Sequence, residues 1–188
     1  TAIQLILNTF RKRTLNKDQT ARLLSDGEAE IIRLKKLVED LLISARLNTG
    51  TKLERENLDA EVIIQALLNQ FQRNNPDFKF EFKKGIGLFS VNTNESGLSL
   101  IISNLLENAI KYSGEEKNVL IKLSKTGDNV NISIEDFGTG IEDKEKSNIF
   151  SQFYRIGDEN IRSSQGTGLG LYIVSELCKK LNIKHLVS

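Results

Sequence analysis

Three polar side chains recur at helical spacing in the middle of the sequence. Asn104, Asn108 and Lys111 are separated by four and then three residues, which places them on one face of a helix. Two carboxamides and an ammonium group in line could hold a metal ion together with the phosphates that it bridges. Taken alone, the same spacing also fits the ordinary polar face of a helix that packs on a core.

A carboxylate followed by two glycines comes next, in Asp136-Phe-Gly-Thr-Gly140 at the end of a predicted strand. A carboxylate in that position can accept a hydrogen bond from an exocyclic amine such as that of adenine. Guanine presents a carbonyl there, and an unpaired carboxylate costs about 1–3 kcal/mol. Gly138 and Gly140 would let the backbone approach a flat ring. The alternative is a simple turn after an edge strand.

A second glycine-rich stretch, Gly166-Thr-Gly168-Leu-Gly170, directly precedes the last predicted helix. Bare N–H groups and the positive end of a helix dipole suit phosphate oxygens. The stretch lacks the lysine of a P-loop and does not follow a strand as a dinucleotide fingerprint does, so a flexible helix entry is the alternative. Between the two stretches, Arg155 is a candidate phosphate ligand, whereas the aromatic residues before it are interpreted as core.

Apolar periodicity predicts the elements that position these residues. The helix over residues 95–112 buries one face. The hairpin of strands 119–123 and 130–134 turns at residues 127–129. Further helices are predicted at residues 59–72, 142–150 and 169–181, a loop at 156–166, and strands at 53–58, 78–82 (with 87–91 as its neighbour) and 183–187.

The first 48 residues predict two helices, over residues 1–13 and from a capping box at Asn16 and Gln19 to residue 48. Apolar residues of the second helix follow a heptad pattern, widened by Leu37 and Leu42, which favours a four-helix arrangement between two chains. The alternative is a plain amphipathic helix that packs on the domain. The heptad seam consists of Ile31, Leu34, Val38, Leu41 and Ala45.

Composition bounds the class of protein. The chain has 188 residues, 39% hydrophobic and 27% charged, with a net charge of +1, so bulk charge indicates neither nucleic acid nor an anionic membrane as a partner. No stretch is long and apolar enough to span a bilayer. The single cysteine, Cys178, lies on an apolar helix face, which fits a reducing compartment and a structural role. The lone His185 has no cluster of metal-ligating residues near it in sequence, so a structural or solvent role is predicted.

In this order and spacing, the segments resemble the ATP-binding domain of sensor histidine kinases, which belongs to the superfamily of gyrase, MutL and the heat-shock chaperones. The N box is similar to residues 104–112 and the phenylalanine box to residues 149–155. The two glycine boxes are similar to residues 136–140 and 166–171. Residues 33–47 resemble the second helix of the dimerisation and phosphotransfer hairpin.

The resemblance implies a role for each matched residue. Asn108 would ligate Mg²⁺ with support from Asn104, Lys111 would meet phosphate, and Tyr112 would pack near the nucleotide. Asp136 would read the adenine amine in a site shaped by Gly138 and Gly140. The segment that would hinge a lid over the triphosphate contains Gly166, Thr167, Gly168, Leu169 and Gly170.

Two departures from the family pattern qualify this picture. The glutamate that activates water in the ATP-hydrolysing relatives corresponds to Asn104, which argues for phosphoryl transfer over hydrolysis. The acceptor histidine, in a His-Glu-x-x-Thr-Pro context, is expected before Thr1, and the closing glycine-rich strand is expected after Ser188. The chain is therefore expected to bind ATP without phosphorylating itself.

We thus expect an α+β chain in which a helical hairpin precedes an α/β sandwich, a mixed sheet with helices on one face. Residues 1–48 would be a truncated hairpin that pairs with a second subunit, residues 49–53 a linker and residues 54–188 the ATP-binding domain. The parent would be a membrane-anchored sensor kinase with this portion in the cytoplasm, passing phosphate from ATP to its own histidine and then to a response-regulator aspartate. No nucleic acid is expected. An ATP-driven clamp of the same superfamily and a nucleotide-free dimeric scaffold are the alternatives.

Overall fold

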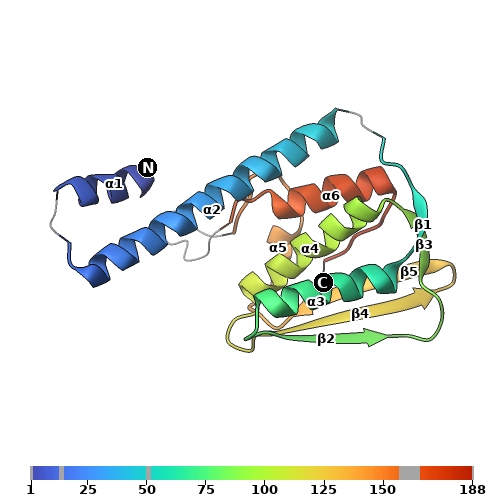
Figure 1. Cartoon of the computed structure of the whole chain (residues 1–188). Helices are drawn as coiled ribbons and strands as arrows, with labels where there is room; N and C mark the ends of the chain where they lie inside the picture. The colour runs from blue at the N-terminus through green and yellow to red at the C-terminus, as the bar shows by residue number, and fades with distance from the viewer. Residues whose placement is uncertain (1, 13–14, 50–51, 157–165, 188) are drawn as a thin grey trace.

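A long helical arm projects from a layered α/β body in the computed structural model, which describes residues 2–12, 15–49, 52–156 and 166–187 (Figure 1). Helix α1 (Ala2–Lys12) folds back beside the first part of α2 (Lys17–Asn48). The predicted capping box opens α2: the Gln19 backbone N–H donates to Asn16 Oδ1 over 2.8 Å, and the Asn16 N–H donates to Gln19 Oε1 over 3.2 Å. No helix in the described ranges is long and apolar enough to cross a membrane.

The body contains two small sheets. Strands β1 (Glu56–Asp59) and β3 (Ser90–Thr93) pair antiparallel. Strands β2 (Lys79–Lys84), β4 (Asn118–Thr126) and β5 (Asn129–Asp136) form a three-stranded sheet in the order β2-β4-β5. Since β2 runs parallel to β4 and β4 antiparallel to β5, this sheet is mixed as predicted. The predicted hairpin turn is confirmed, with Gly127 at φ +59°.

The predicted pairing of residues 87–91 with strand 78–82 is wrong. Val91 pairs with Leu58 of β1, whereas β2 pairs with β4 from Lys79 opposite Asn118 to Lys84 opposite Leu123. Strand β1 itself begins at Glu56, three residues later than predicted, because Leu53 packs against the helices instead. The alternation of apolar and polar residues identified the strands, but it carries no information on which neighbour each one takes.

Two further elements differ from prediction. Residues 183–187 form no strand: Asn182, at φ +56°, ends the last helix, and the His185 ring lies 4.7 Å from that of Phe150 in an edge-on contact. Only Asp143–Lys146 (α5) of the predicted helix 142–150 is helical, because Ile149 turns into the core and is buried. The predicted loop 156–166 lies, apart from its two end residues, outside the described residues.

Helices α3 (Ala60–Asn74) and α4 (Glu95–Tyr112) cover one face of the sheet, and α6 (Gly170–Leu181) packs against α4 and α2 (Figure 1). One apolar cluster lies between the sheet and helices α3 and α4, with Ile64, Phe89, Leu106 and Ile121 fully buried. A second cluster joins α4 and α6 to the end of α2 through Leu37, Ile43 and Leu47. The arm is therefore tied to the body by a core of its own.

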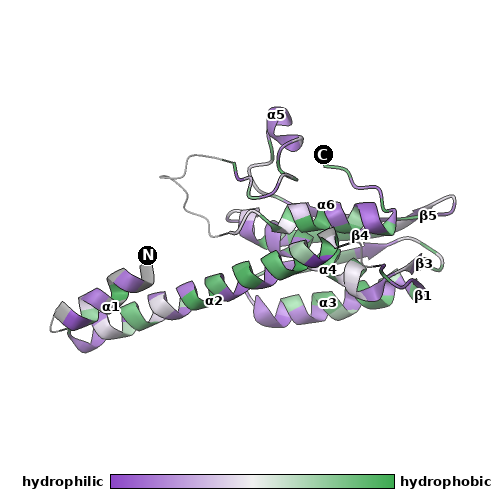
Figure 2. Cartoon of the chain, turned by 90° about the horizontal axis from the view of Figure 1, so that it is seen from above, coloured by the Kyte–Doolittle hydropathy of each residue, from purple (hydrophilic) through white to green (hydrophobic). Residues whose placement is uncertain are grey.

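Helix α2 carries apolar residues on two sides, and they recur along its whole length in Figure 2. One side packs on the body, as the amphipathic alternative requires, and Leu37 belongs to this side and does not widen the seam. The other side is the predicted heptad seam: Ile31 is 60% exposed, Leu34 51% and Leu41 40%. The two interpretations of this helix thus describe different faces of the same element.

Candidate functional site

Helix α4 supplies three of the predicted site residues. Asn94 caps its start by accepting from the Gly97 N–H over 2.8 Å, and Leu98 and Ile102 fix its apolar face in the core. Asn104 does not lie on a solvent-exposed face: it is 3% exposed, and its Nδ2 donates to the Leu100 carbonyl over 2.9 Å. Its Oδ1 faces the first residue of α6 so closely that a Cβ added at Gly170 would lie 2.8 Å away.

The end of α4 presents Asn108, Lys111 and Tyr112. Asn108 is half-buried, and its amide makes no hydrogen bond within the part of the chain that the structure describes. The Lys111 ammonium donates to the Tyr112 hydroxyl over 2.9 Å and lies 4.6 Å from the centre of that ring. It also adjoins the second glycine-rich segment, because a Cβ at Gly166 would lie 2.5 Å from Nζ. The helix end therefore offers an amide oxygen and a cation beside that segment.

The first glycine-rich segment, 136–140, also meets the end of α4. Asp136 ends β5, and its Oδ1 accepts from the Gly138 N–H over 3.0 Å. A Cβ at Gly138 would overlap the Tyr112 carbonyl oxygen, so only glycine fits where the segment crosses the helix end. Oδ2 of Asp136 makes no hydrogen bond among the described residues and is available to a ligand.

The second glycine-rich segment, 166–170, leads directly into α6. Gly168 adopts φ +73°, and its carbonyl accepts from the Phe153 N–H over 3.0 Å. Leu169 is fully buried at the N-cap of α6, where no side chain caps the helix. The Thr167 hydroxyl instead accepts from the Leu169 N–H over 3.2 Å. Unbonded N–H groups in the first turn of a helix are a favourable place for an anion.

Arg155 lies at the end of the aromatic segment that precedes the second glycine-rich segment. It is half-buried and already engaged by other groups of the protein. Its neighbour Tyr154 donates its hydroxyl proton to Glu145 of α5, and this hydrogen bond raises the pKa of Tyr154. The aromatic segment is thus tied to α5, and Arg155 stays a predicted phosphate ligand.

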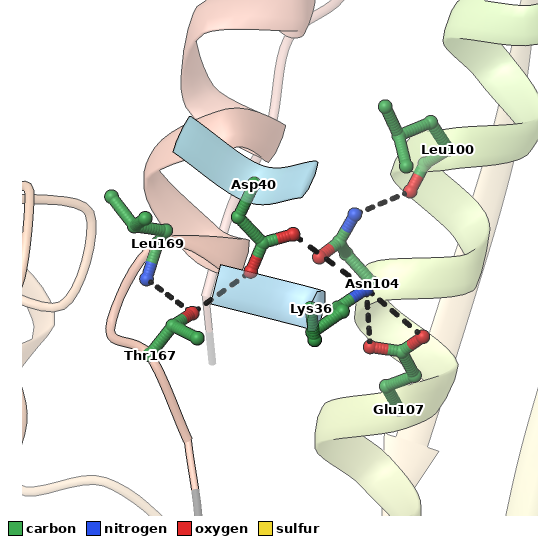
Figure 3. Close-up of polar contacts among 7 residues, drawn as sticks. All are labelled: Lys36, Asp40, Leu100, Asn104, Glu107, Thr167 and Leu169. Atoms are coloured by element: carbon green, nitrogen blue, oxygen red, sulfur yellow. Dashed lines mark hydrogen bonds and ion pairs between the residues drawn. The ribbon is translucent and has the colours of Figure 1, made fainter. Parts of the chain in front are cut away.

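Sequence reasoning missed a polar junction between α2 and this site, drawn in Figure 3. Asp40 of α2 is 3% exposed and accepts from the Thr167 hydroxyl over 2.9 Å. Lys36 lies 3.7 Å from Asp40 Oδ1 and 3.3 Å from Glu107 Oε2 of α4. One signal was present: Asp40 interrupts the apolar side of α2 that includes Leu37, and a charge there needs a partner.

These groups fit a nucleotide with its magnesium ion. The amide oxygen of Asn108, the Lys111 ammonium and the entry of α6 suit phosphate and a hard cation, and the Asp136 carboxylate suits an amine. Among the described residues no group of three or more His, Cys, Asp and Glu side chains could hold a metal ion by itself. A cation here would therefore share its ligands with the phosphates, as Mg²⁺ commonly does.

Comparison with known proteins finds related sequences over most of the chain. Residues 93–187 match the family described as histidine kinase-, DNA gyrase B-, and HSP90-like ATPase. The signal transduction histidine-protein kinase ArlS of Staphylococcus epidermidis is 33% identical over 150 residues, 79% of this chain and 33% of ArlS. The alginate biosynthesis sensor protein KinB of Pseudomonas aeruginosa is 31% identical over 96% of this chain and 30% of its own. The chain thus spans about a third of these relatives.

Solved structures of related proteins have the same fold as this chain. Full-length ShkA in complex with AMPPNP superposes with a TM-score of 0.70 at 25% identity, covering 89% of this chain and 35% of ShkA. The histidine kinase ThkA in complex with the response regulator protein TrrA gives a TM-score of 0.70 at 20% identity, over 82% of this chain and 47% of ThkA. At that identity ThkA supports the fold alone. Both alignments extend beyond the length of the α/β body.

Proposed function

The chain belongs to the histidine kinase-, DNA gyrase B- and HSP90-like ATPase family, and we propose on that premise that it binds Mg-ATP between α4 and the two glycine-rich segments. The observation that carries the proposal is the convergence at one helix end. Lys111 adjoins Gly166, while the Tyr112 carbonyl adjoins Gly138. A single ligand with a flat base at one end and phosphates at the other would engage both segments.

Each residue then has a defined task toward the nucleotide. Asp136 accepts the adenine amine through Oδ2 while Oδ1 keeps its bond to the Gly138 N–H. Lys111 and the N–H groups at the start of α6 hold the phosphates. Asn108 supplies an oxygen to Mg²⁺, which when bound neutralises phosphate charge and favours phosphoryl transfer. Tyr112 packs beside the nucleotide and keeps Lys111 in place.

Asn104 favours phosphoryl transfer over ATP hydrolysis. Its buried amide donates to the Leu100 carbonyl and has no basic group with which to activate water. We propose that the parent protein is a sensor histidine kinase. The bond between the γ-phosphorus and the bridging oxygen of ATP breaks, a phosphorus–nitrogen bond forms on a histidine, and ADP leaves. A response-regulator aspartate would take the phosphoryl group next, a step that the relation to the sensor kinases ArlS and KinB supports.

We infer that this part of the parent lies in the cytoplasm, where ATP is available and the thiol of the free Cys178 stays reduced. The exposed seam of α2 supports pairing with a second copy of the chain. The scaffold alternative keeps the fold and the seam but predicts that no nucleotide binds, so one titration separates the two.

Calorimetric titration with ATP and GTP in the presence of Mg²⁺ tests the proposal. We expect ATP to bind at least tenfold more tightly than GTP, because guanine leaves Asp136 unpaired. Asp136→Asn should weaken ATP binding by about tenfold or more, since the amide presents a donor to the adenine amine. Asp128→Asn, an exposed residue of the β4–β5 turn, is the matched control and should change nothing. Equal affinities for ATP and GTP would contradict the proposal.

A further inference from the structure

The buried carboxylate of Asp40 reaches from α2 into the glycine-rich segment at the start of α6. Asp40 and Thr167 are 127 positions apart in sequence, yet their side chains are hydrogen bonded over 2.9 Å (Figure 3). Apolar contacts of Leu37 and Leu47 with the second core cluster flank the junction along α2. The hydrogen bond is therefore part of a packed interface.

This contact uses the polar groups that a phosphate would need. The Thr167 hydroxyl has one proton, and in this arrangement it donates that proton to Asp40. Its oxygen accepts from the Leu169 N–H, which lies at the entry of α6. The hydroxyl cannot donate to a phosphate oxygen at the same time, so Asp40 and a phosphate compete for one donor.

The negative charge of Asp40 also opposes phosphate binding. A carboxylate beside the phosphate-binding segment disfavours a further polyanion there, more strongly in a buried place than in water. Lys36 compensates the Asp40 charge only in part, because it is 3.7 Å from Asp40 Oδ1 and also pairs with Glu107 of α4. The ion network therefore joins α2 to α4 through Lys36 and Glu107.

We propose that Asp40 is a latch: docking of α2 on the body through the Asp40–Thr167 hydrogen bond and binding of a nucleoside triphosphate at the 166–170 segment exclude each other. The latch rests on the proposed ATP site. It makes the arrangement described here a resting state of low triphosphate affinity. Because the competition is reciprocal, a bound triphosphate loosens α2 from the body to the same extent.

The first test measures binding of ATP and of adenosine, each with Mg²⁺, to the 188-residue chain. Asp40→Ala should raise ATP affinity by about tenfold, since a hydrogen bond to a charged group is lost only from the nucleotide-free state. Asp40→Asn keeps the shape and an acceptor, so the rise should be smaller. Adenosine affinity should not change in either variant, because the adenine site at Asp136 is separate.

Glu39→Ala is the matched control. It removes the same charge from the neighbouring position of α2, where Glu39 faces solvent and pairs only loosely with Lys35 at 3.9 Å. Its ATP affinity should equal that of the unaltered chain. Thr167→Val tests whether release of α2 alone raises ATP affinity. It removes the hydroxyl that bonds Asp40 and, in the nucleotide-bound state, the phosphate. It should therefore release α2 without any gain in ATP affinity.

The second test follows docking directly. Spin labels at Lys35→Cys on α2 and Lys125→Cys on β4, both exposed positions, report the distance between arm and body by electron resonance. In the unaltered chain the distribution of distances between the two labels should be narrow and should broaden when ATP is added. In Asp40→Ala and Thr167→Val it should be broad from the start. Adenosine should not broaden it.

The outcomes separate the latch from the site on which it rests. If neither ATP nor adenosine binds, the proposed function fails and the latch with it. If ATP binds but Asp40→Ala leaves its affinity unchanged or lowers it, the latch alone is wrong and Asp40 merely supports the 166–170 segment. A narrow distribution of label-to-label distances in nucleotide-free Asp40→Ala would likewise overturn the latch.

Discussion

Gly170 faces Asn104 so closely that a methyl group added at Gly170 would lie 2.8 Å from the Asn104 side-chain oxygen. Asn104 cannot easily move away, because it is buried and its Nδ2 is bonded to the Leu100 carbonyl. The contact fixes the first turn of α6 against the middle of α4. It thereby sets where the N–H groups of the 166–170 segment lie relative to Lys111.

Gly170→Ala should therefore destabilise the body and weaken ATP binding together. Overpacking of a buried contact costs about 1–3 kcal/mol. Urea unfolding measures the loss. Gly27→Ala is the control, because Gly27 lies in α2 with nothing within 4 Å of an added Cβ. That change should stabilise its helix by about 0.5–1 kcal/mol. Equal midpoints for the two variants would show that the Asn104 contact is not tight.

The exposed seam of α2 should make the chain self-associate. Burial of the seam residues Leu34 and Leu41 against a second copy removes apolar surface from water, whereas Leu41→Glu would bury a charge and should give a monomer. Val62→Glu changes an apolar residue of α3 that is 64% exposed and should leave association intact. Sedimentation equilibrium distinguishes the states. A monomeric unaltered chain at high concentration would contradict the prediction.

Incubation with labelled ATP and Mg²⁺ should leave the chain without phosphohistidine. Its one histidine, His185, packs edge-on against Phe150 and is flanked in sequence by Lys184 and Leu186, so it has no adjacent carboxylate in the sequence to activate it. The chain should instead label an added hairpin that carries an acceptor histidine. An acid-labile, base-stable label on the chain itself, lost in His185→Ala, would refute this assignment.

Cys178 should resist alkylation in the folded protein. Burial raises the pKa of its thiol to about 11, so at pH 8 almost none of the reactive thiolate is present. Iodoacetamide should label it slowly until urea unfolds the chain, and then quickly. Above the ordinary thiol pKa, the unfolded chain loses this proton before the folded one does. The Cys178 contribution to stability therefore falls as pH rises toward 11.

Local signals in the sequence predicted local structure well. The capping box at Asn16 and Gln19, helix α4 with its apolar face, and the turn at Gly127 all depend on residues within a few positions of one another. The same is true of the site segments that pair a motif with an adjoining helix. Their contacts with α4, of Gly166 with Lys111 and of Gly170 with Asn104, join residues far apart in sequence, and the roles of these residues toward ATP stay predictions.

What escaped prediction depends on contacts distant in sequence. The partner of β2 is β4, which follows only after β3 and α4 in the chain, and the irregular segment 183–187 places His185 against Phe150, 35 positions away in sequence. Asn104 looked like a polar surface residue, but α6 covers it. Asp40 was passed over within an apolar helix pattern, since its partner Thr167 belongs to the other end of the chain.

The parallel pairing of β2 with β4 has a consequence for the order of folding. Thr126 and Asn129 close the β4–β5 hairpin within a few residues, and hairpins form in about 1–10 μs. Lys79 pairs with Asn118, and β3 and α4 lie between these two residues in the chain. Pairings between residues so far apart in sequence slow folding. Since α4 contacts both β4 and β5, we expect the hairpin and α4 to form the nucleus and β2 to join late. Substitutions in the hairpin would then slow refolding, whereas those in β2 would mainly speed unfolding.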